Sequence, residues 1–158
     1  MSAKIGIDFH GVIDAQPELF AAFCREIRKL GVQVYIISGG PEKDVARCLQ
    51  EHRIEYDGLW AILDYYETQG KVQRFDDGSF QVPTELWNRA KAEFCAREGI
   101  KFHIDDSPVY GKYFASSYCQ YNMANDVCAL EDGVEIDFKE TTEAVYKVAA
   151  LLKGECAE

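Results

Sequence analysis

Several short hydrophobic runs in this chain end in side chains that could perform chemistry. These end residues are Asp8, Ser38 and the adjacent pair Asp105-Asp106. Carboxylates can act as nucleophiles, as acid–base groups or as metal ligands, and a hydroxyl beside free backbone amides can bind an anion. Ligands of open α/β sheets bind at the carboxyl ends of the strands, so we expect these side chains to share one cleft.

The segments between these residues predict the elements that must position them. Lys4–Ile7 and residues 32–37 have the composition of buried strands, and residues 17–30 between them carry apolar side chains at helical spacing. Strand, helix and strand in this order form a βαβ unit with parallel strands. Gly11 permits a tight turn after Asp8, and Gly31 ends the helix.

The same periodicity and turn residues predict the rest of the chain. We expect a helix from Ser38-Gly39-Gly40-Pro41 to His52, a strand within 58–63 and a polar hairpin over 65–82 that turns at 76–79. A helix from Pro83 to Gly99, with Thr84 as N-cap, and a strand over 101–104 should follow. The chain should then form a hairpin of 127–130 with 134–138 and a helix from Thr141 or Thr142 to about Lys153. This order predicts one α/β domain over residues 1–158, a three-layer α/β/α Rossmann-like fold with a mainly parallel central sheet. A small cap-like hairpin would be inserted at about 64–82.

Composition and charge exclude several classes of protein. The hydrophobic share of 47% and the charged share of 28% are those of a globular protein, and the net charge of −10 argues against binding to a nucleic-acid backbone. The six cysteines form no CxxC pair, and the three histidines do not pair at zinc-site spacing. With no signal peptide or membrane-length apolar run, we expect a cytoplasmic protein with reduced thiols and no membrane partner.

The carboxylates and the serine suggest a metal ion and a phosphate. Asp105 and Asp106 would repel each other unless they are solvated, paired or bound to a cation. Because side chains alternate along a strand, we expect one of them to face the cleft and the other to orient a neighbour. Carboxylate oxygens suit Mg²⁺, and the Ser38 hydroxyl with the following amides suits phosphate, unless Ser38 only caps the helix.

The order of these motifs resembles that of the haloacid dehalogenase (HAD) superfamily of phosphatases. One hydrophobic strand precedes Asp8-Phe9-His10-Gly11-Val12, a second precedes Ser38-Gly39, a lysine follows, and a third precedes Asp105-Asp106. The resemblance spans roughly residues 4–115; each motif is short, and their order and strand context together are fairly specific. It implies a HAD-like core with a minimal cap or none.

The resemblance also implies roles for individual residues. Asp8 would attack phosphorus, form an aspartyl-phosphate and ligate Mg²⁺. Ser38 and the Gly39 amide would bind the phosphoryl oxygens. Asp106 would ligate Mg²⁺ with Asp105 in support, and position 10 would contribute its backbone carbonyl to the metal.

A lysine completes the expected phosphate site. Lys91 lies in the helix before the last motif strand, where the resemblance places the family's lysine, and we favour it. Lys101, at the start of that strand, and Lys71, in the insertion, are the alternatives. Lys91 would otherwise be an ordinary exposed helix lysine.

Position 10 departs from the family pattern. Phosphatases of this family usually carry an Asp there, which protonates the leaving group and then activates water, whereas this chain has His10. Imidazole can do both, since its ordinary pKa lies close to cellular pH. Three outcomes are open: His10 acts as acid and base with a changed pH profile, the leaving group needs little help from an acid, or phosphate is bound without efficient turnover. We do not expect Asp14 to substitute.

The expected function is therefore a Mg²⁺-dependent phosphomonoester phosphatase. One alternative is a catalytically weak phosphate-binding or regulatory protein. A receiver-like signalling domain is a weaker one, because a receiver's acidic pair should follow the first strand and Asp105-Asp106 come late.

The identity of the phosphorylated substrate stays open. The aromatic residues of the expected hairpin could stack on a base, pack a dimer or anchor the hairpin to the core; they are Tyr65, Tyr66, Phe75 and Phe80. An open cleft resembles family members that act on macromolecular phosphates or that borrow a lid from a partner subunit, so a homo-oligomer is also an open alternative.

Overall fold

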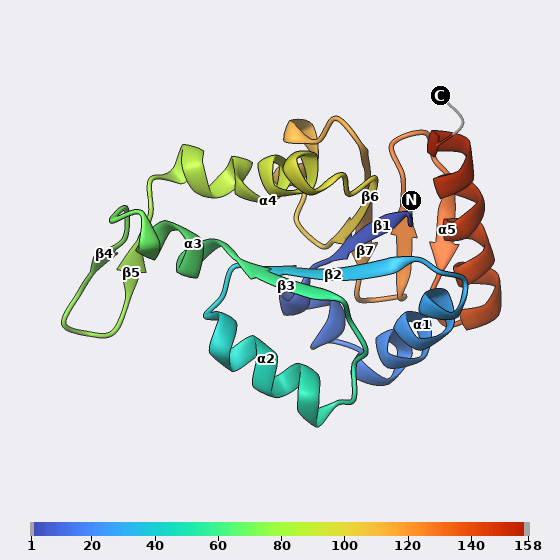
Figure 1. Ribbon diagram of the computed structural model, residues 1–158, viewed down its shortest axis with the longest axis horizontal. Coiled ribbons are helices and arrows are strands. Elements are labelled where there is room, and N and C mark those ends of the chain that lie inside the picture. The colour runs from blue at the N-terminus through green and yellow to red at the C-terminus, as the bar shows by residue number, and fades with distance from the viewer. Residues whose placement is uncertain (1, 157–158) are drawn as a thin grey trace.

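A mainly parallel sheet of seven strands organises the chain. In the computed structural model, which describes residues 2–156, the strand order is β3-β2-β1-β6-β7-β8-β9, with β3 to β7 parallel and with β8 and β9 added antiparallel at one edge. The strands of this sheet are β1 (Lys4–Ile7), β2 (Gln33–Ser38), β3 (Gly58–Ala61), β6 (Phe102–Asp105), β7 (Ser117–Asn122), β8 (Val127–Ala129) and β9 (Glu135–Asp137). A separate hairpin consists of β4 (Gln73–Arg74) and β5 (Phe80–Gln81), and it projects from the end of the molecule opposite α5 (Figure 1).

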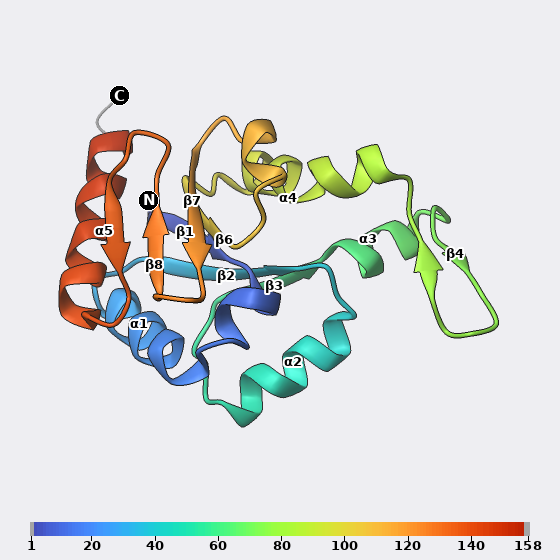
Figure 2. The same cartoon turned by 180° about the vertical axis from the view of Figure 1, so that it is seen from behind.

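Helices cover both faces of the sheet. They are α1 (Pro17–Lys29), α2 (Glu42–Glu51), α3 (Ile62–Thr68), α4 (Thr84–Glu98) and α5 (Thr141–Cys156), with short helical turns η1 (Phe9–Ile13) and η2 (Tyr110–Tyr113). α1, α2 and α5 lie on one side of the sheet, and α4 lies on the other with α3 beside it (Figures 1 and 2).

Alternation along β2 explains the two layers of core. Val34 and Ile36 join the main core with α1, α2 and α5, whereas Ile37 packs with Phe94 and Cys95 of α4. Neighbouring side chains of a strand point to opposite faces, so a central strand that is apolar throughout must be covered on both sides. Full burial of each such side chain contributes roughly 1.5–3 kcal/mol of transfer free energy.

The α/β class and the mainly parallel sheet are confirmed, and three local expectations are wrong. Residues 65–70 belong to α3 and its end rather than to a hairpin, because Ile62 and Tyr66, four residues apart, bury one helical face. The hairpin itself turns at 76–79 as expected. Thr84 is the first residue of α4 and not its N-cap, and β7 was not expected at all.

The cysteines also differ from expectation in one respect. Cys119 on β7 and Cys128 on β8 form a disulfide, so the expectation that all thiols are reduced is wrong for this pair. Cys24 and Cys95 are free and buried, and burial raises the pKa of each thiol to about 12. Among the helices of residues 2–156, none has the length and apolar character needed to cross a membrane.

Candidate functional site

The site lies where the chain reverses its direction of travel across the sheet. β1 is flanked by β2 on one side and by β6 on the other, so the carboxyl ends of these strands meet at a topological switch point. The residue after β1 is Asp8, whose backbone amide donates a hydrogen bond of 2.8 Å to the Ile104 carbonyl of β6. Ser38 ends β2 and Asp105 ends β6. The structure therefore brings these three residues to one edge of the sheet.

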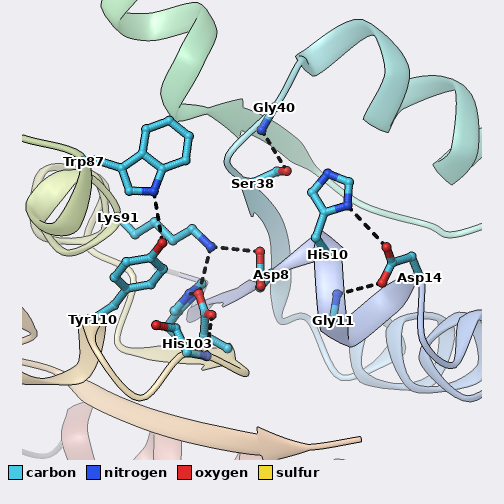
Figure 3. A network of polar contacts seen from close by, with 12 residues as sticks. Asp8, His10, Gly11, Asp14, Ser38, Gly40, Trp87, Lys91, His103 and Tyr110 are labelled. Atoms are coloured by element: carbon cyan, nitrogen blue, oxygen red, sulfur yellow. Dashed lines mark hydrogen bonds and ion pairs between the residues drawn. The ribbon is translucent and has the colours of Figure 1, made fainter. Parts of the chain in front are cut away.

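Lys91 connects two of the carboxylates. Its Nζ donates hydrogen bonds of 2.8 Å to Asp8 Oδ1 and of 2.8 Å to Asp105 Oδ2 (Figure 3). The residue is only 3% exposed, so the interpretation of Lys91 as an exposed helix lysine is wrong. Lys101 lies at the opposite end of the sheet, where its amide donates to the Lys4 carbonyl, and Lys71 is exposed beside the hairpin.

One ammonium shared by two carboxylates sets the electrostatics of the site. Burial disfavours the charged form of Lys91, but the carboxylates of Asp8 and Asp105 outweigh burial and raise the pKa of Lys91. Burial also acts on Asp105, yet Lys91 and His103 together hold the pKa of Asp105 well below its usual range. At Asp8 burial prevails over the attraction of Lys91, and the Asp105 carboxylate adds to it, so the pKa of Asp8 is raised. Asp8 is thus the less neutralised carboxylate.

His103 supports Asp105 from inside the protein. The ring is fully buried, its Nε2 lies 2.9 Å from Asp105 Oδ2, and it stacks on Phe114 with ring centroids 5.2 Å apart. Gly6 of β1 pairs with His103, and a Cβ on Gly6 would lie 2.7 Å from His103 Nδ1. A glycine at position 6 is therefore what makes room for the imidazole.

Three carboxylates lie close enough together to share a metal ion. Asp8, Asp105 and Asp106 each offer an oxygen, and these oxygens lie within 4.8 Å of one another. The expectation that only one residue of the Asp105-Asp106 pair would reach the cleft is wrong, because β6 ends at Asp105 and the strand alternation does not extend to Asp106. Three carboxylates face one ammonium, so a cation with a preference for oxygen ligands fits both the donor set and the charge.

Gly11 allows Asp106 to approach the first motif. Its φ is +84°, and a Cβ at this position would lie 2.1 Å from Asp106 Oδ2. Both the left-handed backbone and the lack of space require glycine here. The turn η1 and the loop after β6 consequently meet directly over the carboxylate cluster.

The Ser38 loop is organised differently from a simple helix cap. Ser38 is buried, its Oγ accepts a hydrogen bond of 3.1 Å from the Gly40 amide, and α2 begins only at Glu42. The alternative that Ser38 merely caps α2 is therefore wrong. Asp64 of α3 caps α2 instead, because its Oδ1 accepts a hydrogen bond of 2.8 Å from the Glu42 amide. The first amide of α2 is consequently taken by a carboxylate, and the Ser38-Gly39 segment lies before the helix rather than within its first turn.

His10 lies on the side of Asp8 opposite Lys91 (Figure 3). Its side chain is 58% exposed, and its Nδ1 lies 3.2 Å from Asp14 Oδ2. Asp14 Oδ1 also accepts a bond of 2.7 Å from the Gly11 amide, so the carboxylate is tied to the same turn that carries His10. Asp14 therefore contacts both the imidazole of His10 and the backbone of the turn that carries it.

Sequence reasoning missed three residues beside the site. Trp87, Tyr110 and His103 were not singled out, although Trp87 stands four residues before Lys91 and His103 is a polar residue within an apolar strand. Trp87 Nε1 donates a bond of 3.0 Å to the Tyr110 hydroxyl, and the Lys91 Nζ lies 5.3 Å from the centroid of the Tyr110 ring. The helical spacing of Trp87 and Lys91 was the available signal.

The site as a whole combines a cluster of carboxylates, a buried lysine, a hydroxyl with adjacent amides, and an accessible imidazole. No protein-family profile matches the chain, and no curated protein sequence matches it at a significant level. The geometry and the chemistry of these side chains therefore carry the functional assignment.

Proposed function

We propose that this protein is a Mg²⁺-dependent phosphomonoester hydrolase with a HAD-like active site, in which Asp8 forms an aspartyl-phosphate. The observation that carries the proposal is the contact of Lys91 Nζ with Asp8, 2.8 Å long, inside a cluster of three carboxylates beside Ser38. This combination provides a carboxylate nucleophile and positive charge for an anionic substrate at one edge of the sheet.

The reaction would proceed in two displacements. A carboxylate oxygen of Asp8 forms a bond to phosphorus while the bond to the leaving-group oxygen breaks, and His10 gives that oxygen a proton. Water then attacks the phosphorus of the aspartyl-phosphate, His10 takes a proton from the water, and phosphate and the Asp8 carboxylate are released. Lys91 and the Ser38-Gly39 segment hold the phosphoryl oxygens in both steps.

Asp8, Asp106 and Asp105 would hold the metal ion, with the backbone carbonyl of His10 as a further ligand. Mg²⁺ supplies charge neutralisation between an anionic nucleophile and an anionic substrate. The pKa of Asp8 is raised mainly by burial and further by the Asp105 carboxylate, although Lys91 opposes both, so a bound cation would add to the charge that Lys91 supplies.

A second candidate is a phosphate-binding protein with little turnover. The observation that favours it is His10 itself, because its imidazole contacts Asp14 and stands where the resembling phosphatases carry a carboxylic acid. Without a group that protonates the leaving oxygen, the site would bind a phosphate ester and release it unchanged.

A panel of phosphate esters assayed with Mg²⁺ separates the two candidates. We expect the wild-type protein to release phosphate and Asp8→Asn to lose this activity, with a hydroxylamine-sensitive phosphoryl-protein trapped only in the wild type. Retention of full activity by Asp8→Asn would rule out the nucleophile. If the wild type is inert and His10→Asp turns over, the phosphate-binding candidate is correct.

A further inference from the structure

One face of α4 presents an aromatic side chain beside the proposed phosphate site. Trp87 and Lys91 are four residues apart and therefore lie on the same face, one turn from each other. Lys91 reaches Asp8, whereas Trp87 stands over Gly39, where a Cβ would lie 3.0 Å from the Trp87 ring. The indole thus borders the segment that we propose to hold the phosphoryl oxygens.

Tyr110 joins this face from the other side of the site. Its ring lies 5.3 Å from Lys91 Nζ, and its hydroxyl accepts the hydrogen bond from Trp87 Nε1 (Figure 3). The indole N–H of Trp87 and the hydroxyl of Tyr110 are therefore hydrogen-bonded to each other, so the indole N–H does not need a water molecule as its acceptor. Both side chains stay half-exposed at the mouth of the site.

The hairpin extends the aromatic surface away from the carboxylates. The Phe80 ring of β5 lies 5.9 Å from the Trp87 ring and is 37% exposed. Phe75 in the hairpin is 43% exposed. Aromatic side chains that served only as anchors would be buried, as Tyr66 of α3 is at 4% exposure. We refer to Tyr110, Trp87 and Phe80 as the aromatic wall.

We propose that the aromatic wall is the leaving-group subsite and that the substrate is a phosphate monoester of an alcohol that carries a planar aromatic ring. The inference rests on the proposed function, because the wall begins at the groups proposed to hold the phosphoryl oxygens. A phosphoryl group at Asp8 and Ser38-Gly39 places its leaving group at the site mouth, which the wall borders. Aromatic side chains stack favourably on planar rings such as nucleobases, because every such ring has a π-face. The net charge of −10 favours a small ester over a polyanion.

Two pairs of substrates test the inference, because each pair differs only in the ring. Adenosine 5′-monophosphate and ribose 5-phosphate share the same reacting ester, as do 2-phenylethyl phosphate and ethyl phosphate. We expect kcat/KM to favour the ring-bearing member by about tenfold or more in at least one pair, the size of effect that stacking of one base gives. A preference in both pairs defines the ligand as any planar ring, and a preference in the first alone defines it as a nucleoside.

Variants then locate the preference on the wall. Phe80→Ala and Trp87→Leu should reduce the ratio of kcat/KM between the paired substrates, mainly through KM. Tyr146→Ala removes an aromatic residue that is 62% exposed on α5, at the far end of the molecule, and should leave the ratio unchanged. Equal turnover of both members of each pair, or a ratio unchanged in Phe80→Ala and Trp87→Leu, would overturn the subsite while the phosphatase proposal stands.

A binding measurement separates the subsite from catalysis. In Asp8→Asn with Mg²⁺, adenosine 5′-monophosphate should quench tryptophan fluorescence, and the quenching should survive Trp60→Phe and disappear in Trp87→Phe. If no ester is hydrolysed and this quenching is still seen, the hydrolase proposal fails and the subsite stands. If quenching is absent or depends on Trp60, which stacks on Phe94, the subsite is wrong.

Discussion

His103 Nε2 lies 2.9 Å from Asp105 Oδ2 in a fully buried position, and within the described residues His103 Nδ1 has no hydrogen-bond partner. Burial is the main reason that the pKa of His103 is lowered, which favours a neutral ring, and a proton on Nε2 would let that ring donate to the Asp105 carboxylate. Asp105 in turn accepts from Lys91. The His103 imidazole therefore positions the Asp105 carboxylate, and that carboxylate in turn positions the Lys91 ammonium.

Replacement of His103 tests this chain of contacts. We expect His103→Leu to lower kcat by about tenfold, the lower end of what loss of an outer-shell partner of a metal or catalytic group costs, and His103→Gln to recover part of it because an amide can still donate to Asp105. Nitrogen NMR of the wild type should report the Nε2-protonated tautomer at neutral pH. A ring protonated on Nδ1 instead would contradict the assignment.

Loss of the lysine charge should destabilise the fold in the absence of metal. Lys91→Met leaves Asp8 and Asp105 buried without their ammonium, which costs on the order of 3–5 kcal/mol in the free energy of unfolding. Lys101→Met is the matched control, because Lys101 is exposed and a surface change of this kind stays within about 0.5 kcal/mol. Urea denaturation of both variants in EDTA gives the comparison. Equal stability of the two would show that Lys91 does not neutralise the pair.

Mg²⁺ should raise the melting temperature of the protein without any substrate. A ligand present at 100 times its dissociation constant stabilises the folded state by about 2.7 kcal/mol. Asp106→Asn should remove this shift, whereas Asp44→Asn on the surface of α2, where Asp44 pairs with Arg47, should keep it. Thermal unfolding with EDTA and with a series of Mg²⁺ concentrations measures the effect. A shift retained in Asp106→Asn would place the ion elsewhere.

Two glycines with nearly the same backbone separate conformational strain from crowding. Gly11 and Gly31 have φ values of +84° and +85°, but a Cβ at Gly11 meets Asp106 whereas a Cβ at Gly31 meets nothing within 4 Å. We expect Gly31→Ala to cost about 1 kcal/mol for the left-handed backbone alone, and Gly11→Ala to cost more and also to weaken the Mg²⁺-dependent shift. Equal effects of the two changes on stability and on the metal response would contradict the proposed approach of Asp106.

The ion pair between Asp57 and Arg28 should make stability depend on pH. Arg28 donates bonds of 3.1 and 3.0 Å to the two oxygens of Asp57, and the hydrogen bond with Arg28 is the main reason that the pKa of Asp57 is lowered. The unfolded chain then binds this proton more readily than the folded protein. The stabilisation is fully present above the unfolded pKa of about 3.9 and is lost as pH falls through the lower folded pKa.

Asp57→Asn measures that contribution. It should reduce the free energy of unfolding by about 1 kcal/mol at pH 7, as expected for a partly exposed bidentate pair, and the difference from the wild type should shrink towards pH 3. In an Arg28→Leu background the same change should have a smaller effect, which a double-mutant cycle would show. A difference that grows at low pH would contradict a lowered pKa of Asp57 in the folded protein.

The sequence allowed the strand-end residues to be predicted because hydrophobic runs mark buried parallel strands and their carboxyl ends share one edge. Asp8, Ser38 and Asp105 followed from that rule alone. β7 did not follow from this rule, because in Ser117–Asn122 only every second side chain is buried and the segment is not a continuous hydrophobic run. Tyrosine is common in strands, so Tyr65 and Tyr66 favoured a strand in the sequence. The segment forms α3 instead, because a helix buries one face of it.

Other features depended on the tertiary structure and have no local signal. The cap of α2 comes from Asp64 on α3, and the space for His103 comes from Gly6 on a different strand. The reach of Asp106 depends on Gly11 in the first motif. Such pairs become visible only when the strand order is known.

The placement of Trp87 and Lys91 on one helix has a consequence for how the site selects ligands. Four residues of α-helix rise about 6 Å, so α4 fixes the distance along its axis between the positions that carry the Lys91 ammonium and the Trp87 indole. A rigid helix keeps that interval constant, and a single inserted or deleted residue between the two would rotate one of them by about 100° out of line. The spacing of the two side chains, more than the identity of either, would then set which molecules fit.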